Sequence, residues 1–205
     1  MNCIYCDRKI DQITLVDLLF KEDQLCRHCR EGLQIHRKII TIEDLQIETF
    51  FEYESIFRSI LLQYKECCDE ALKDVFLHQL SFYIYVRYFG YEIVLIPSSE
   101  AKKAKRGFDH LKLIFESTGL KINEGLIMKK QLIQEAGTAE QRKQMIGNYD
   151  YIGKSLYKAL IVDDVLTTGS SLYGAYKALK PYARKIKALS LARVHDFTNI
   201  ETSVL

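Results

Sequence analysis

The segment that most constrains the fold is an apolar strand that ends in two acidic residues and then turns through glycine into a helix. Leu160-Ile-Val162 is apolar throughout, and Asp163-Asp164 follows it directly. Hydroxyl residues and Gly169 come next, and Gly169 to Leu179 is predicted as a helix. A wholly apolar strand joined in this way to a helix is typical of a parallel sheet that is covered on both faces.

Other strands and helices alternate around this segment. Ile93 to Ile96 and Ile186 to Arg193 are predicted strands, whereas Phe108 to Ser117 and Ala139 to Ile146 are predicted helices. The pattern predicts an α/β fold with a parallel sheet covered by helices. Ligands of such sheets bind beyond the carboxyl ends of the strands, so we expect functional residues after Ile96 and after Val162.

The chain before Gly90 is predicted to form one strand and one long helix. The strand covers Ile47 to Tyr53, at the end of an acidic connector, and the helix covers Asp69 to Phe89. Aromatic residues are frequent in this helix, namely Phe82, Tyr83, Tyr85, Tyr88 and Phe89. Such rings either stack on nucleic-acid bases or pack in a core, and their helical spacing favours the core.

The turn after Val162 has the chemistry of a phosphate site. Successive backbone N–H groups at a helix N-terminus attract an anion, and the hydroxyls between Thr167 and Ser171 add donors. Asp163-Asp164 would repel that anion unless the carboxylates meet ribose hydroxyls or a bridging Mg²⁺. The segment therefore predicts a sugar phosphate ligand. A simple helix cap is the alternative, and it leaves the paired acids unexplained.

Four of the six cysteines form two pairs with identical spacing near the N-terminus. Cys3-Ile-Tyr-Cys6 and Cys26-Arg-His-Cys29 each suit a tight turn that directs two thiolates to one point. Two such turns supply the four ligands of a closed structural Zn²⁺ site. Thiols that merely pack and a redox C-x-x-C are the alternatives, and the repeated spacing favours the metal. We predict a zinc site at Cys3, Cys6, Cys26 and Cys29.

The composition excludes disordered, fibrous and membrane-spanning classes. The chain is 48% hydrophobic and 27% charged with 10 Gly and 2 Pro, and it has no apolar run of about 18 residues. Its start has no apolar signal region, so we expect a cytoplasmic protein without membrane insertion. We predict a four-cysteine zinc-finger module at residues 1–40 and an α/β domain at residues 41–205. Because the net charge is only +2, nucleic-acid binding would depend on local basic clusters.

Residues 159–171 resemble the phosphoribosyl pyrophosphate (PRPP) motif of type I phosphoribosyltransferases. The resemblance implies that Asp163 and Asp164 bind the ribose hydroxyls of PRPP, with Mg²⁺ present. It also implies that the 5-phosphate contacts the turn, at Thr167, Thr168, Gly169, Ser170 and Ser171. Ser171 stands where that family commonly has threonine, and it keeps the hydroxyl.

Together with the four-cysteine module, these residues resemble the competence protein ComFC/ComF family, whose phosphoribosyltransferase-like domain follows an N-terminal zinc finger. The resemblance covers nearly the whole chain. Three further segments are similar to that family: Phe51-Glu-Tyr53 with Lys65, Ile96-Pro-Ser98 with Lys105-Arg-Gly-Phe-Asp109, and Gln134 through Arg142. The departures from the family pattern are Asp109, Gly137 and Met145.

The loop after Ile96 is rich in cations, with Lys102, Lys103, Lys105 and Arg106 within five positions. In the resembled enzymes this loop meets pyrophosphate. Arg106 is the residue that we expect to hold an anion in bidentate fashion, and with Asp163 and Asp164 it completes the catalytic candidates. A solvated lysine face is the alternative. His110 is interpreted as a surface residue without a role.

The resemblance implies a cytosolic component of natural transformation that handles incoming single-stranded DNA beside a ComFA-like helicase. The sequence leaves open whether the PRPP-type site catalyses pentosyl transfer or only binds a ligand. The alternative function is a metabolic, amidophosphoribosyltransferase-like enzyme that acts on a small-molecule or base acceptor. The zinc module favours the role in DNA handling over the metabolic enzyme, because proteins that bind nucleic acid commonly use zinc knuckles and a metabolic transferase has no obvious need of one.

Two basic clusters are candidates for contact with single-stranded DNA. The first is in the zinc module, which we rank first, at Arg8, Lys9, Arg27, His28, Arg30, Arg37 and Lys38. The second lies near the C-terminal end of the chain, at Lys177, Lys180, Arg184, Lys185 and Lys187.

Overall fold

The computed structural model describes residues 2–10, 24–128 and 149–194. Its centre is a six-stranded sheet with the order β1-β2-β8-β7-β3-β4. These strands are β1 (Lys38–Ile42), β2 (Leu45–Glu52), β8 (Ala183–Arg193), β7 (Leu156–Leu166), β3 (Glu92–Leu95) and β4 (Ile122–Asn123). All neighbouring strands are parallel except the β1-β2 hairpin, which confirms the predicted α/β class.

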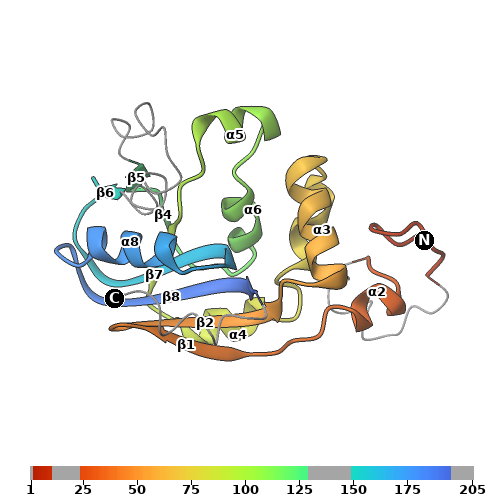
Figure 1. The fold of residues 1–205 in the computed structure, drawn as a ribbon, viewed down its shortest axis with the longest axis horizontal. Helices are drawn as coiled ribbons and strands as arrows, with labels where there is room; N and C mark the ends of the chain where they lie inside the picture. The colour runs from red at the N-terminus through yellow and green to blue at the C-terminus, as the bar shows by residue number, and fades with distance from the viewer. Residues whose placement is uncertain (1, 11–23, 129–148, 195–205) are drawn as a thin grey trace.

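The middle of the sheet is covered on both faces. Ala159 to Val162 of β7 is fully buried, because β7 lies between β8 and β3 and both α8 and α6 pack against it. α8 (Ser170–Leu179) and α6 (His110–Glu116) lie on one side of the sheet in Figure 1, and α4 (Ser81–Arg87) lies on the other. A separate antiparallel pair, β5 (Leu126–Met128) and β6 (Tyr149–Tyr151), lies close to α8 (Figure 1).

The prediction of one helix over residues 69–89 is wrong. The structure has a 3-10 helix, η1 (Glu70–Val75), then a turn, and then α4. The reason is that Val75, Phe76 and Leu77 are all buried. Consecutive residues of a helix point about 100° apart, so three in a row cannot share one buried face, and the chain turns here instead.

The aromatic residues of this region are divided between the core and the surface. Tyr88 is buried, as predicted, but Phe82 and Phe89 are 78% and 67% exposed. Tyr83 and Tyr88 donate hydrogen bonds from their hydroxyls to the carboxylate of Glu48 on β2, which also accepts one from Arg37. Glu48 therefore lies in the core. β2 confirms the predicted strand over residues 47–53, but the residues before it are not a connector, because they belong to the β1-β2 hairpin of the sheet.

Two helices that the sequence reading did not predict complete the domain. α3 (Ser55–Glu66) buries Phe57, Ile60, Leu61 and Tyr64 along one face. α5 (Glu100–Arg106) follows β3 and ends at Gly107, whose φ of +81° places it in the left-handed region. In the described part of the chain, none of the helices has the length and apolar run that a membrane span requires.

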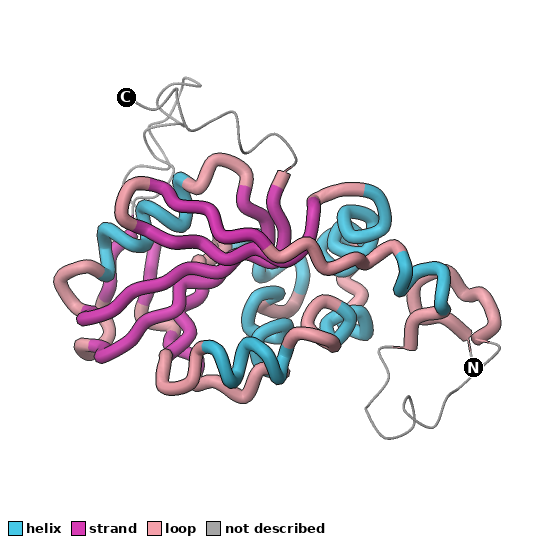
Figure 2. The backbone as a smooth tube through the Cα atoms, turned by 90° about the horizontal axis from the view of Figure 1, so that it is seen from below, coloured by secondary structure: helices cyan, strands magenta, loops and turns pink. Residues whose placement is uncertain are grey.

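The N-terminal module lies at the end of the molecule away from α8 and the β5-β6 pair (Figures 1 and 2). It contains α2 (Arg27–Glu31), and Gly32 follows it so close to α3 that a Cβ at this position would overlap the side chain of Ile56. Arg193, at the end of β8, fixes the segment that leaves the module. Its guanidinium donates to the carbonyl of His36 at 2.8 Å and pairs with Glu52 at 3.0 Å.

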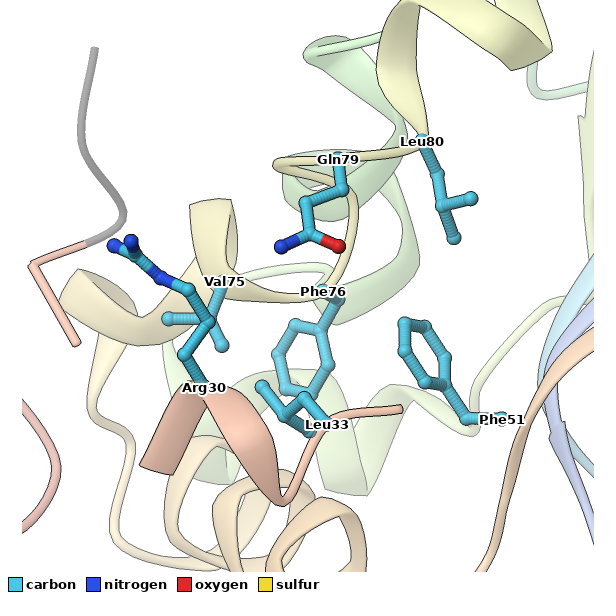
Figure 3. A pocket seen from close by; sticks show the side chains of 7 residues that line it. All are labelled: Arg30, Leu33, Phe51, Val75, Phe76, Gln79 and Leu80. Carbon is cyan, nitrogen blue, oxygen red and sulfur yellow. The ribbon is translucent and has the colours of Figure 1, made fainter. Parts of the chain in front are cut away.

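An apolar pocket marks the junction between the module and the sheet (Figure 3). Arg30 and Leu33 approach it from α2 and the residues after it, and Phe51 approaches from β2. The segment from η1 to α4 supplies the rest of the lining, namely Val75, Phe76, Gln79 and Leu80. Residue 40, the predicted module boundary, lies within β1.

Candidate functional site

The turn after β7 has the geometry of an anion-binding loop. Gly169 has a φ of +74° and is the N-cap residue of α8. A Cβ at this position would also overlap Ile42 Cδ1 in the neighbouring hairpin. Glycine is therefore required here for two reasons. Larger residues rarely adopt this φ, and the side chain of Ile42 lies directly against the backbone.

Hydroxyl groups gather at the start of α8. The hydroxyls of Thr168 and Ser170 are 2.8 Å apart, and the backbone N–H of Ser170 donates to Thr168 Oγ1 at 3.4 Å. A small pocket opens at this point, lined by Asp163, Val165, Leu166, Thr167, Gly169, Ser171 and Leu172. The structure thus brings together the hydroxyls, the glycine and one acidic residue of the predicted set. Backbone N–H groups at the N-terminus of a ten-residue helix favour an anion here.

Asp163 lines this pocket and differs in environment from its neighbour. Its Oδ1 accepts the backbone N–H of Asp164 at 2.9 Å. Burial, together with the charge of Asp164, raises the pKa of Asp163 well above the usual range for a carboxyl. A cation or ribose hydroxyls bound next to Asp163 would favour its ionised form.

Asp164 is buried and already paired. Its Oδ2 accepts hydrogen bonds from His110 Nε2 at 2.7 Å and from Lys65 Nζ at 2.5 Å. Burial alone would raise the pKa of Asp164, but the hydrogen bond from His110 and the positive charge of Lys65 outweigh it and hold the pKa far below its usual range. Asp164 thus carries a stable negative charge inside the domain.

His110 and Arg106 continue this network. His110 is only 4% exposed, so its interpretation as a surface residue is wrong. Arg106 Nη1 lies 3.0 Å from His110 Nδ1, and because a guanidinium only donates, Nδ1 must accept. The ring proton is therefore on Nε2 and points to Asp164. The chain of hydrogen bonds runs from Arg106 through His110 to Asp164.

The predicted cationic loop is the helix α5, and three of the four cations predicted there have partners close by. Lys103 pairs with Asp109 at 3.0 Å and Lys105 pairs with Glu66 at 3.4 Å. The buried Arg106 donates from Nε to the carbonyl of Lys65 at 3.1 Å. The bidentate contact of Arg106 with an anion stays a prediction.

The four predicted metal ligands meet at one point. The sulfur atoms of Cys3, Cys6, Cys26 and Cys29 all lie within 4.8 Å of one another, and those of Cys6 and Cys26 are 3.6 Å apart. Tetrahedral Zn²⁺ with bonds of about 2.3 Å places its sulfur ligands about 3.8 Å apart, so the donor set fits this ion. Three of the four cysteines are buried. The arrangement is suited to holding a structural metal.

In both predicted basic clusters some of the cations already have partners within the protein. In the module, Arg27 pairs with Glu31 at 2.7 Å, and beyond it Arg37 pairs with the buried Glu48. In the second cluster Lys180 pairs with Asp44 at 3.0 Å, and Arg184 lies over the ring of Tyr157.

Some of the predictions fall outside the described residues. They are the family-like segment Gln134–Arg142, the predicted helix 139–146, and the departures Gly137 and Met145.

The comparisons with known proteins agree with the sequence motifs. Competence protein ComFC from Streptococcus pneumoniae (strain ATCC BAA-255 / R6) is 28% identical over 171 residues, which cover 80% of this chain and 71% of that protein. This relative and the clustered cysteines confirm the resemblance to the ComFC/ComF family. No family model matches the chain.

A solved structure of a hypoxanthine phosphoribosyltransferase from Staphylococcus aureus is also similar. The identity is 16% and the TM-score is 0.40. The similarity covers 60% of this chain and 64% of the transferase, so this chain spans less than two thirds of the transferase's length. A similarity of this size carries no argument about ligands or reaction.

Proposed function

We propose that this chain is a cytoplasmic, ComFC-like component of DNA uptake in natural transformation, with a PRPP-type ribose-phosphate site at the carboxyl end of β7. The observation that carries the proposal is the junction of Asp163 with the glycine-capped N-terminus of α8. Carboxylate and anion site lie side by side there, in a chain that is similar to a competence protein.

Within this proposal different residues of the site bind different parts of the ligand. The N–H groups at the start of α8 and the hydroxyls from Thr167 to Ser171 bind the 5-phosphate. Asp163 is the acid available to the ribose hydroxyls and Mg²⁺, because Oδ2 of Asp164 already binds Lys65 and His110. When bound, Mg²⁺ would neutralise the pyrophosphate next to Asp163. Asp164 orients Lys65 beside the site.

The proposed cofactor of the module is one structural Zn²⁺ on the four cysteines. A module of about forty residues has too little core to fold without such a staple. The proposed partners are single-stranded DNA and a ComFA-like helicase, both of which rest on the family resemblance.

A metabolic phosphoribosyltransferase is the second candidate function, and Asp163 with the anion loop would serve it equally well. The two differ in whether a nitrogen acceptor displaces pyrophosphate. Release of pyrophosphate from PRPP and Mg²⁺ with a panel of base and amine acceptors separates a transferase from a protein that only binds the ligand.

The site itself is tested by the rise in melting temperature that PRPP and Mg²⁺ cause, because a ligand that binds only the folded state stabilises it. Asp163→Ala with Asp164→Ala should abolish the rise. The matched control is Glu70→Ala with Asp74→Ala, which removes two exposed carboxylates on η1. An unchanged rise in the first variant would contradict the assignment of the ribose site.

A further inference from the structure

The amino ends of three neighbouring strands carry aromatic rings and cations. Tyr91 comes just before β3, Tyr157 and Lys158 are near the start of β7, and Arg184 is near the start of β8. These strands are parallel and adjacent in the order β8-β7-β3, so their amino ends lie side by side. This edge of the sheet is opposite the ribose-phosphate site, which lies at the carboxyl ends.

Rings and cations alternate along this edge. Lys158 Nζ is 5.4 Å from the ring centroid of Tyr91 and 5.9 Å from that of Tyr157. Arg184 Cζ is 5.6 Å from the ring centroid of Tyr157. Each distance is within the range of a cation–π contact, so the cations are held next to the rings.

Exposed rings extend the edge at both ends. Phe89 precedes Gly90, where a Cβ would be 3.8 Å from Lys158 Nζ, and Tyr182 precedes Arg184 by two residues. Phe89, Tyr157 and Tyr182 are 67%, 61% and 41% exposed. We define the aromatic-cationic edge as Phe89, Tyr91, Tyr157, Lys158, Tyr182 and Arg184.

We propose that the aromatic-cationic edge binds single-stranded nucleic acid. Exposed rings accept unpaired bases by stacking, and cations beside the rings contact the phosphates that join those bases. A duplex hides the faces of its bases, so this chemistry selects a single strand. Glu92, at the start of β3, pairs with Lys121 at 3.1 Å, so its charge is balanced locally.

Other occupants fit the edge less well. In a symmetric dimer built on this surface, the same patch of both copies would meet, and Lys158 and Arg184 would face like charges. An anionic membrane would first engage the apolar stripe of α4, where Phe82 and Val86 are the most exposed residues of the helix. The inference deepens the proposed role in DNA handling, but its residues are separate from those of the ribose-phosphate site.

The test is fluorescence anisotropy with the zinc-loaded full chain and a labelled oligothymidylate of about 20 nucleotides, at two salt concentrations. Phe89→Ala with Tyr157→Ala should lower the affinity at least about tenfold. An abasic oligonucleotide of the same length keeps the phosphates and lacks the bases. It should therefore bind the parent protein as weakly as the normal oligonucleotide binds the double variant. Lys158→Glu with Arg184→Glu should reduce the logarithmic salt slope by about 0.7 for each phosphate that the protein no longer neutralises.

Two matched controls separate this edge from general effects. Lys102→Glu changes an exposed charge at the other edge of the sheet, and Phe82→Ala removes an exposed ring that lies off the edge. Both should bind the oligonucleotide like the parent. Stabilisation by PRPP and Mg²⁺ should persist in Phe89→Ala with Tyr157→Ala, so a failure of the ribose-phosphate site would be recognised separately.

Three outcomes would overturn the inference. They are equal binding of the abasic and normal oligonucleotides, a loss in Phe82→Ala equal to that in Phe89→Ala with Tyr157→Ala, and binding to phosphatidylglycerol vesicles but not to the oligonucleotide. The first would leave charge alone as the cause of binding, and the other two would move the contact to the apolar stripe of α4.

Discussion

At its carboxyl edge the sheet presents backbone N–H groups, hydroxyls and a carboxylate around a small recess, whereas at its amino edge it presents open rings with cations between them. The carboxyl edge is built by the backbone, since Gly169 shapes the turn and α8 orients its N–H groups. The amino edge is built by side chains alone. A recess of fixed donors suits one small anion, and an open row of rings suits a flexible polymer.

The largest expected effect concerns the zinc module. Its basic cluster ranked first for DNA contact from the sequence, but the proposal above moves that contact to the amino edge, so we expect the module to be independent of both edges. Cys26→Ser should reduce bound zinc from about one ion per chain to almost none, because it removes one of four ligands of a closed site. Elemental analysis measures the metal, and Cys67→Ser, at an exposed cysteine, is the control. Binding of PRPP and of DNA should persist in Cys26→Ser. Loss of DNA binding together with zinc would show that the amino edge depends on the module.

The two edges should respond differently to pH. The pKa of Asp163 is raised in the folded protein, so the group keeps its proton as pH rises past the value at which an unfolded chain releases it. Mg²⁺ and PRPP need the carboxylate, so their affinity should rise up to about tenfold per unit between about pH 6 and about pH 8.

The ligand-free protein should itself lose stability as pH rises through this range, because the unfolded chain binds fewer protons there than the folded protein. The stabilisation by ligand should grow in step with its affinity. Calorimetry across this range checks the trend, and Asp163→Asn should flatten it. DNA binding should stay level, since the amino edge is at the opposite end of the strands from Asp163. A parallel pH dependence at both edges would show that they are coupled.

Gly169→Ala should lower the free energy of unfolding by about 2 kcal/mol and weaken PRPP binding, because it combines a strained φ with an overlap at Ile42. Denaturant titration measures the first effect and calorimetry the second. Gly107→Ala is the control, since Gly107 has a φ of +81° but has no other atom within 4 Å of a Cβ. Equal losses in the two variants would mean that the contact with Ile42 adds nothing.

The smallest effect is expected at His110, which positions Asp164 without touching the pocket. His110→Ala should weaken PRPP binding about tenfold, because a hydrogen bond to a buried charged carboxylate is worth about 1.5–3 kcal/mol. His110→Gln can still donate to Asp164 and should restore much of the affinity. Failure of glutamine to restore it, at equal melting temperature, would contradict the positioning role.

The carboxyl edge was predictable because its parts are consecutive in the chain. The strand, Asp163-Asp164 and the glycine turn all fall within a dozen residues, so one motif predicts both the fold and the candidate site. The partners of Asp164 were not predictable in this way. Lys65 and His110 are 99 and 54 positions from it, and only the packing of α3 and α6 brings them together.

The amino edge shows the same limit of local patterns. The helical spacing predicted that Phe82 and Phe89 lie in the core. The buried run from Val75 to Leu77 instead ends η1, and α4 starts in a different orientation, so these two rings face solvent. Tyr91, Tyr157 and Arg184 are far apart in sequence. Their common edge follows from strand order, which a single sequence does not contain.

The hydrogen bond from Arg193 to the carbonyl of His36 has a consequence for biosynthesis. The four cysteines leave the ribosome before the sheet does, so the module can bind a metal ion while most of the sheet is still untranslated. The segment after the module gains this anchor only when β8 has been made. Nascent chains that stop short of residue 193 should therefore carry a metal-loaded module on a loose tether.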